Sequence, residues 1–222
     1  MRVLHHYWLS TGSRFSRLML AERKLNVMLK LEHYWERQKA FLMLNPASSV
    51  PVMVEDDGTV LVGVWAITEY LEDAFPETAL ITGNAGQKAE IRRLTDWFAS
   101  KVEREVITPL INEKLMRRLT SEGVPSSTTI RAAMANLSVH LEYINHLAEQ
   151  RKWLAGSKLS TADLYAAASL SVADYFGDVH WQDWPEAKTW YSRVKSRPSF
   201  RSLLSDTVTG ITPPAHYTDL DF

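Results

Sequence analysis

Three hydroxyl side chains, those of Tyr7, Ser10 and Ser13, stand where a short apolar strand gives way to a helical pattern near the start of the chain. A hydroxyl at such a junction can act on a bound ligand. It can also do no more than cap the helix, because a serine oxygen accepts hydrogen bonds from the free N–H groups of the first helical turn. Both interpretations of Ser10 and Ser13 stay open at this level.

Other reactive groups are scarce. The 222 residues include no cysteine, which excludes disulfides, thiolate metal sites and cysteine-based redox chemistry. The seven histidines show no i, i+4 pairing with a carboxylate in a metal-binding pattern, so we expect no metal site.

The charge pattern limits the classes of partner. The formal net charge is −1, from 25 basic and 26 acidic residues without a long run of either sign, so we expect no nucleic-acid partner. Apolar runs stay well short of the roughly 18 residues that a membrane span needs. We therefore expect a cytoplasmic protein without membrane insertion.

The pair Val50-Pro51 leads into a predicted strand at about 51–55, which the turn Asp57-Gly58 connects to a second strand at about 59–63. Proline lacks a backbone N–H, and cis peptide bonds are nearly confined to X-Pro pairs. A cis Val50-Pro51 bond would direct a peptide edge into a cleft. The remaining strands and helices of this part are predicted at 2–8, 13–25, 27–31, 35–44 and 65–74. We therefore expect a thioredoxin-like α/β domain over residues 1–77. Arg14 and Arg17 of its first helix could bind an anion or the acid of a partner, but we expect them to be solvated surface charges.

The rest of the chain has a helical pattern. After a linker at 78–87, apolar residues recur every three or four positions from Ile91 to Leu110, and again from Met134 to Leu147. Ser160 and Asp163 have the spacing of a capping box at the start of a further helix. We expect an all-α domain over 88–205 and an extended tail over 206–222.

Three motifs resemble the glutathione-transferase (GST) superfamily in order and spacing. They are Val50-Pro51, the segment Leu154-Ala155-Gly156 with Ser160-Thr161-Ala162-Asp163, and Trp190 with Arg197-Pro198-Ser199-Phe200. The resemblance covers nearly the whole chain and implies the GST fold, an α/β domain followed by an all-α domain, in a homodimer.

The resemblance also implies where glutathione would bind. Ser10 stands in the position of the serine that stabilises the glutathione thiolate in serine-type members, with Ser13 and the less well spaced Tyr7 as alternatives. Members of the superfamily usually carry Glu-Ser at the start of the third helix, where this chain has Gly63 and Val64.

Valine cannot donate a hydrogen bond to the γ-glutamyl carboxylate, and losing a partner to a charged group costs about 1.5–3 kcal/mol. We therefore expect Val50, Pro51, Gly63 and Val64 to be remnants of a degenerate glutathione site, with no catalytic residue and no cofactor. The alternative is a serine-type glutathione transferase acting on small electrophiles, and only this alternative requires glutathione.

Two more segments resemble a GST-like family of alphaproteobacterial cell-division factors, the FtsZ-localised proteins A. They are 33–42, which contains Tyr34-Trp35-Glu36-Arg37, and 213–222, which contains Tyr217 and ends Asp219-Leu220-Asp221-Phe222. The resemblance implies a non-catalytic homodimer at the division site. Such a protein binds the tubulin-like GTPase FtsZ and regulates filament architecture and constriction.

An aromatic residue flanked by charges suits a protein-binding anchor, so Trp35, Tyr34 and Arg37 are the candidate partner-binding residues. Packing of Trp35 on the edge of the sheet is the other interpretation. In the tail, Tyr217, Leu220 and Phe222 could bind a partner or fold back on their own domain.

Overall fold

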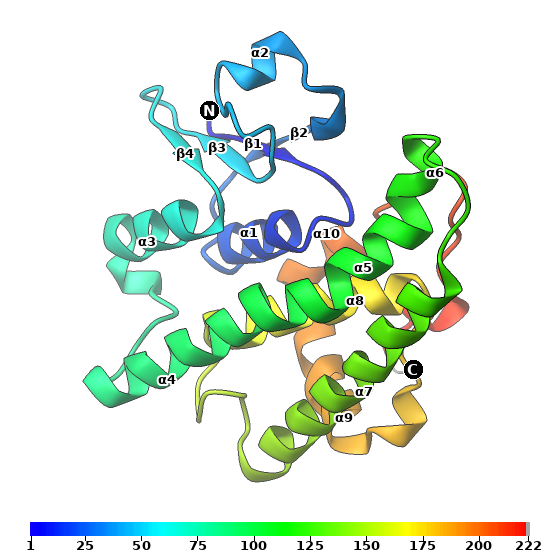
Figure 1. Cartoon of the computed structure of the whole chain (residues 1–222). Helices are drawn as coiled ribbons and strands as arrows, with labels where there is room; N and C mark the ends of the chain where they lie inside the picture. Colours follow the sequence, from blue (N-terminus) through cyan, green and yellow to red (C-terminus); the bar gives the residue numbers. More distant parts are fainter. Residues whose placement is uncertain (221–222) are drawn as a thin grey trace.

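A four-stranded mixed sheet forms the centre of the first part of the chain in the computed structural model, which describes residues 1–220 (Figure 1). The strand order is β2-β1-β3-β4, with β1 parallel to β2 and the other pairs antiparallel. The strands are β1 (Val3–His6), β2 (Met28–Leu31), β3 (Val52–Val54) and β4 (Val60–Val62). Leu4 of β1 pairs with Met53 of β3, and both side chains are fully buried.

Two helices of this part pack against each other beside the sheet, α1 (Thr11–Glu22) and α3 (Val64–Ala74). The continuous helix predicted over 35–44 is wrong. The segment forms the 3-10 turn η1 (Tyr34–Glu36) and the short helix α2 (Lys39–Leu42). Arg37 between them has a left-handed backbone, with φ of 50°, which cannot continue a right-handed helix.

One long helical rod crosses the molecule diagonally in Figure 1 and begins the second part. It follows the turn η2 (Pro76–Thr78), and Asn84 and Gln87 form a capping box at its start. Its consecutive segments are α4 (Ala85–Asp96), π-helical η3 (Trp97–Ile107), α5 (Thr108–Ile111), π-helical η4 (Asn112–Met116) and α6 (Arg117–Leu119). The predicted apolar stripe from Ile91 to Leu110 is buried along this rod.

The remaining helices include α8, in which every residue is buried and which packs against α1, α4, η3 and α9. They are α7 (Ser127–Gln150), α8 (Thr161–Tyr175), η5 (Trp181–Asp183), α9 (Pro185–Lys195), η6 (Pro198–Phe200), α10 (Arg201–Leu204) and η7 (Ala215–Tyr217). Because α8 packs against both α1 and α4, it joins the sheet domain to the helical domain.

The predicted capping box at the start of α8 is confirmed. The Asp163 carboxylate accepts hydrogen bonds from the N–H of Ser160 at 3.0 Å and from the N–H of Leu154 at 2.8 Å. The indole Nε1 of Trp190 on α9 donates to the same carboxylate at 3.0 Å. One buried acid therefore fixes the cap of α8, the loop before it and α9.

The segment from Asp206 onward returns to helix α1. The expectation that Arg14 and Arg17 are solvated is wrong, because both are buried against the Asp206 carboxylate. Arg17 makes two hydrogen bonds to Asp206, at 2.8 and 2.9 Å, and Arg14 makes one at 3.3 Å. Arg14 also donates to the hydroxyl of Tyr217 at 2.9 Å. The tail thus neutralises two cations of the first helix.

Within residues 1–220, no helix is long and apolar enough to cross a membrane.

Candidate functional site

A cleft of about 310 Å³ opens between the sheet domain and the helical rod. The sheet domain contributes the first turn of α1, Tyr34, the loop before β3 and the start of α3, while η3, α5 and α8 close the other side. Its lining residues are Ser10, Thr11, Gly12, Tyr34, Ser49, Val50, Val64, Glu103, Thr108, Ile111, Asn112 and Tyr165. The Val50-Pro51 bond at its edge is cis.

Of the three candidate catalytic hydroxyls, one lines this cleft. Ser10 is half-buried there as the N-cap of α1, and its Oγ accepts a hydrogen bond from the N–H of Ser13 at 3.3 Å. Ser13 is fully buried and its own Oγ accepts from the N–H of Tyr7 at 3.3 Å. Tyr7 is buried and lines a different pocket, and burial raises the pKa of its phenol to about 12. Neither group faces the cleft.

Val64, the first residue of α3, occupies the position where a glutathione site is expected to have a carboxylate-binding serine. Gly63 has φ of 84° and α3 has no side-chain cap. Val64 packs so closely on α1 that a Cβ atom at Gly12 would lie 2.6 Å from Val64 Cγ2. The apolar side chain of Val64 therefore closes this end of the cleft against α1. Trp65, which follows it, is 43% exposed.

One carboxyl group in the cleft was missed from the sequence. Glu103 lies on η3 and its Oε1 accepts a hydrogen bond from the Thr108 hydroxyl at 3.2 Å. Burial raises the pKa of Glu103, and the hydroxyls of Thr11 and Thr108 offset only part of that rise. The only sequence signal was its position beside Val102 in the buried stripe, one residue away from the apolar face.

The candidate partner-binding residues are next to one another at the turn η1, where Tyr34 lines the cleft and Trp35 and Arg37 do not. Trp35 is half-buried and stacks on His33, with ring centroids 4.9 Å apart, and its ring meets the edge of Tyr7 at the same separation. Tyr34 contacts Trp35 edge to face, while Arg37 is exposed beside them. The aromatic cluster is defined as Tyr7, His33, Tyr34 and Trp35, and all of these except Tyr34 line a second pocket of about 290 Å³.

That second pocket brings the aromatic cluster next to the tail. Its walls include Leu119 at the end of α6 and residues 207–209. Farther along the tail, Tyr217 is fully buried and its hydroxyl donates to the carbonyl of Leu203 at 3.1 Å. Leu220 is half-buried, and Phe222 lies outside the described residues.

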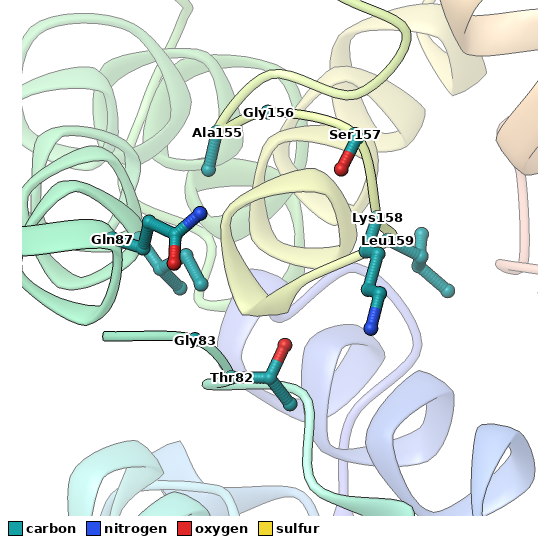
Figure 2. A pocket seen from close by; sticks show the side chains of 9 residues that line it. Thr82, Gly83, Gln87, Ala155, Gly156, Ser157, Lys158 and Leu159 are labelled. Atoms are coloured by element: carbon teal, nitrogen blue, oxygen red, sulfur yellow. The ribbon is translucent and has the colours of Figure 1, made fainter.

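A third hollow, of about 160 Å³, lies where the linker meets the loop before α8. Figure 2 shows Thr82, Gly83 and Gln87 on the linker side and residues 155–159 across from them. No carboxylate or imidazole lines this hollow in the described part of the chain, and Lys158 is its one ionisable side chain among those residues. Within residues 1–220 no cluster of side chains could hold a metal ion.

Two domain families match the chain. Residues 10–74 match the glutathione S-transferase N-terminal domain and residues 93–198 match the C-terminal domain. FtsZ-localized protein A of Caulobacter vibrioides is 44% identical over 100% of this chain and 98% of its own length. Maleylacetoacetate isomerase of Pseudomonas aeruginosa is 28% identical over 89% of this chain and 93% of its own length.

Solved structures agree with this assignment. A glutathione S-transferase from Rhodospirillum rubrum F11 has a TM-score of 0.98 and 51% identity, and FzlA from C. crescentus has a TM-score of 0.97 and 44% identity. Both matches cover 100% of this chain, and they cover 100% and 99% of the respective neighbours. The chain therefore belongs to the glutathione S-transferase family and is a full-length homologue of FtsZ-localized protein A.

Proposed function

We propose that this chain is a non-catalytic GST-like protein that binds FtsZ and regulates filament architecture and constriction during bacterial cell division. The observation that supports this most is the 44% identity to FtsZ-localized protein A, which extends across both domains and the tail. The isomerase, at 28% identity, matches a smaller share of the chain, whereas the glutathione S-transferase of Rhodospirillum rubrum F11 is 51% identical over all of it.

The aromatic cluster is the surface that we propose for the partner. Trp35 is held on three sides by His33, Tyr34 and Tyr7, so its ring is already ordered before a partner arrives. Ordering side chains on binding is costly, and rigid aromatic anchors beside a charged residue avoid part of that cost. The exposed Arg37 supplies the charge.

Co-sedimentation with polymerised FtsZ tests this proposal. Wild-type protein is expected in the pellet, and Trp35→Ala should weaken binding about 30-fold, the effect of losing a hot-spot residue. Trp65→Ala is the matched control, because this indole is on the sheet domain and 43% exposed but lies outside the aromatic cluster. A wild-type protein that stays in the supernatant contradicts the function. A normal pellet for Trp35→Ala, with its fold checked by circular dichroism, removes Trp35 from the surface.

Serine-type glutathione transfer is the second candidate, and the position of Ser10 on the cleft wall favours it. Against it, Val64 offers no hydrogen bond at the start of α3, and the lining residues between 1 and 220 include no lysine, arginine or histidine for the glutathione carboxylates. A calorimetric titration with glutathione separates the two candidates. We expect no saturable heat, whereas tight binding with turnover of an electrophile that Ser10→Ala abolishes would support the enzyme.

We further propose a cytoplasmic homodimer that gathers at the division site. Light scattering on the eluting protein should give twice the mass of one 25.3 kDa chain. A fluorescent fusion should form a midcell band that disappears when FtsZ is depleted. A monomer in solution or a uniformly distributed fusion would contradict the corresponding part.

A further inference from the structure

The outer edge of the central sheet is open along strand β2, which is the last strand in the sheet order and pairs only with β1. The N–H groups of Met28 and Glu32 donate to carbonyls on the β1 side, at 2.9 and 2.8 Å. Backbone groups alternate in direction along a strand, so those of Leu29 and Leu31 point away from β1. Within residues 1–220 they have no hydrogen-bond partner. Such an edge is a template for a further strand.

The side chains of β2 are exposed rather than covered. Met28, Leu29 and Leu31 are all exposed, and Lys30 is the one charged residue of the strand. Because side chains alternate between the faces of a strand, Leu29 and Leu31 share one face of the sheet and Lys30 lies on the other. A strand added beside β2 would therefore be matched by apolar residues on the first face and acidic residues on the second.

Three exposed cations lie at this edge without acids to neutralise them. Lys30 is on the strand, and Arg37 and Lys39 flank Gln38, which lines a hollow of about 140 Å³ together with Lys30. None of the three cations makes an ion pair within residues 1–220. The nearby carboxylate of Glu36 is already paired with a histidine at 3.3 Å. The charge beside β2 is therefore complementary to an acidic partner.

We propose that the outer edge of β2 binds an extended peptide of a partner protein, in which acidic and apolar residues alternate, as one more strand of the sheet. Backbone hydrogen bonds to Leu29 and Leu31 would hold the peptide in register. Leu31 also lines the pocket of about 290 Å³ beside the aromatic cluster, so the peptide reaches that pocket at the end of β2. There Trp8 and Leu119 offer apolar walls to one large side chain of the peptide.

The opposite edge of the sheet shows why charge selects β2. Strand β4 is also an outermost strand, and its Val60 and Val62 are exposed. The turn that leads into β4, however, carries the exposed acids Asp56 and Asp57. An acidic peptide would be repelled there and attracted to Lys30 at the other edge.

Fluorescence polarisation with a labelled synthetic peptide tests the proposal. The probe alternates aspartate with valine and carries one phenylalanine in place of a valine. Two further probes have N-methyl groups on alternate backbone nitrogens, one on each of the two sets that point in opposite directions. We expect saturable binding of the parent peptide and about tenfold weaker binding of just one N-methylated probe, the one whose methylated nitrogens face β2.

Lys30→Glu should weaken the parent peptide about tenfold, because it reverses the charge beside the added strand. Lys158→Glu is the matched control, since it reverses an exposed lysine in the helical domain, and it should leave binding unchanged. The assay contains no FtsZ, so its failure is distinguishable from a failure of the proposed division role, which this docking site goes beyond.

Three results would overturn the proposal. The first is no saturable binding, and the second is an equal effect of the two N-methylated probes. The third is an undiminished affinity in Lys30→Glu. Light scattering provides a further check, because a Lys30→Glu protein with half the mass of wild type would assign this edge to a second copy of the chain instead.

Discussion

A buried histidine in the central strand should make this protein sensitive to mild acid. The imidazole of His6, at the end of β1, is 1% exposed and meets Trp8 edge on, with ring centroids 4.7 Å apart. Neither ring nitrogen has a partner within residues 1–220. Burial, and then the nearby Arg17, Arg14 and His5, lower the pKa of His6 from its usual 6.5 to about 3.

The sign and size of the effect follow from proton linkage. Below pH 6.5 the unfolded chain binds a proton at this position while the folded chain does not, so acid favours unfolding. Each pH unit between 6.5 and 3 removes about 1.4 kcal/mol of stability, and the loss ends below the folded pKa. At pH 5 the expected loss from His6 alone is therefore about 2 kcal/mol, a large part of the stability of an ordinary domain.

Urea unfolding followed by tryptophan fluorescence measures this loss. The free energy of unfolding of wild type and His6→Gln should be compared at pH 7.5 and at pH 5. Because carboxylates titrate in both proteins, the difference between them isolates His6, and the variant should gain about 2 kcal/mol relative to wild type at the lower pH. His146→Gln controls for the loss of an exposed imidazole. An unchanged difference between the two pH values would refute the reasoning.

Three further substitutions test the packing. Asp206→Ala should cost about 3–5 kcal/mol in urea unfolding, since it leaves two buried guanidinium groups without their carboxylate, and a loss under 1 kcal/mol would contradict the burial. Asp163→Ala should cost about 3 kcal/mol and shift the fluorescence of Trp190, whose indole loses its acceptor; an unshifted spectrum would count against that bond. Gly12→Ala should cost about 1–3 kcal/mol and be rescued by Val64→Ala, and an unrescued double mutant would place the strain elsewhere.

The fold was predictable where local pattern and tertiary structure agree. The apolar stripe from Ile91 to Leu110 and the capping box of Ser160 and Asp163 are short-range signals, and both are confirmed. The segment 35–44 was mispredicted because its apolar residues suggested a helix, whereas the left-handed backbone of Arg37 interrupts it. No pattern in the sequence predicts a left-handed backbone at an arginine.

The ion pairs between residues far apart in the chain could not be predicted from the sequence, for a different reason. Arg14 and Arg17 read as solvated charges on a helix, and their partner Asp206 lies about 190 positions later in the chain. Glu103 was missed likewise, because a carboxylate near an apolar stripe gives no sign that a second domain covers it. Ser10 lies at the cleft and Trp35 is half-buried, but the roles of both residues stay predictions.

The pairing of α1 with the tail has a consequence during synthesis. The two arginines leave the ribosome near the start of translation, and the carboxylate that neutralises them is made almost at the end. Until then the nascent first helix carries bare cations on the face that later becomes interior, which opposes its premature burial against α8. We therefore expect the two domains to pack together only after the last segment of the chain has been synthesised.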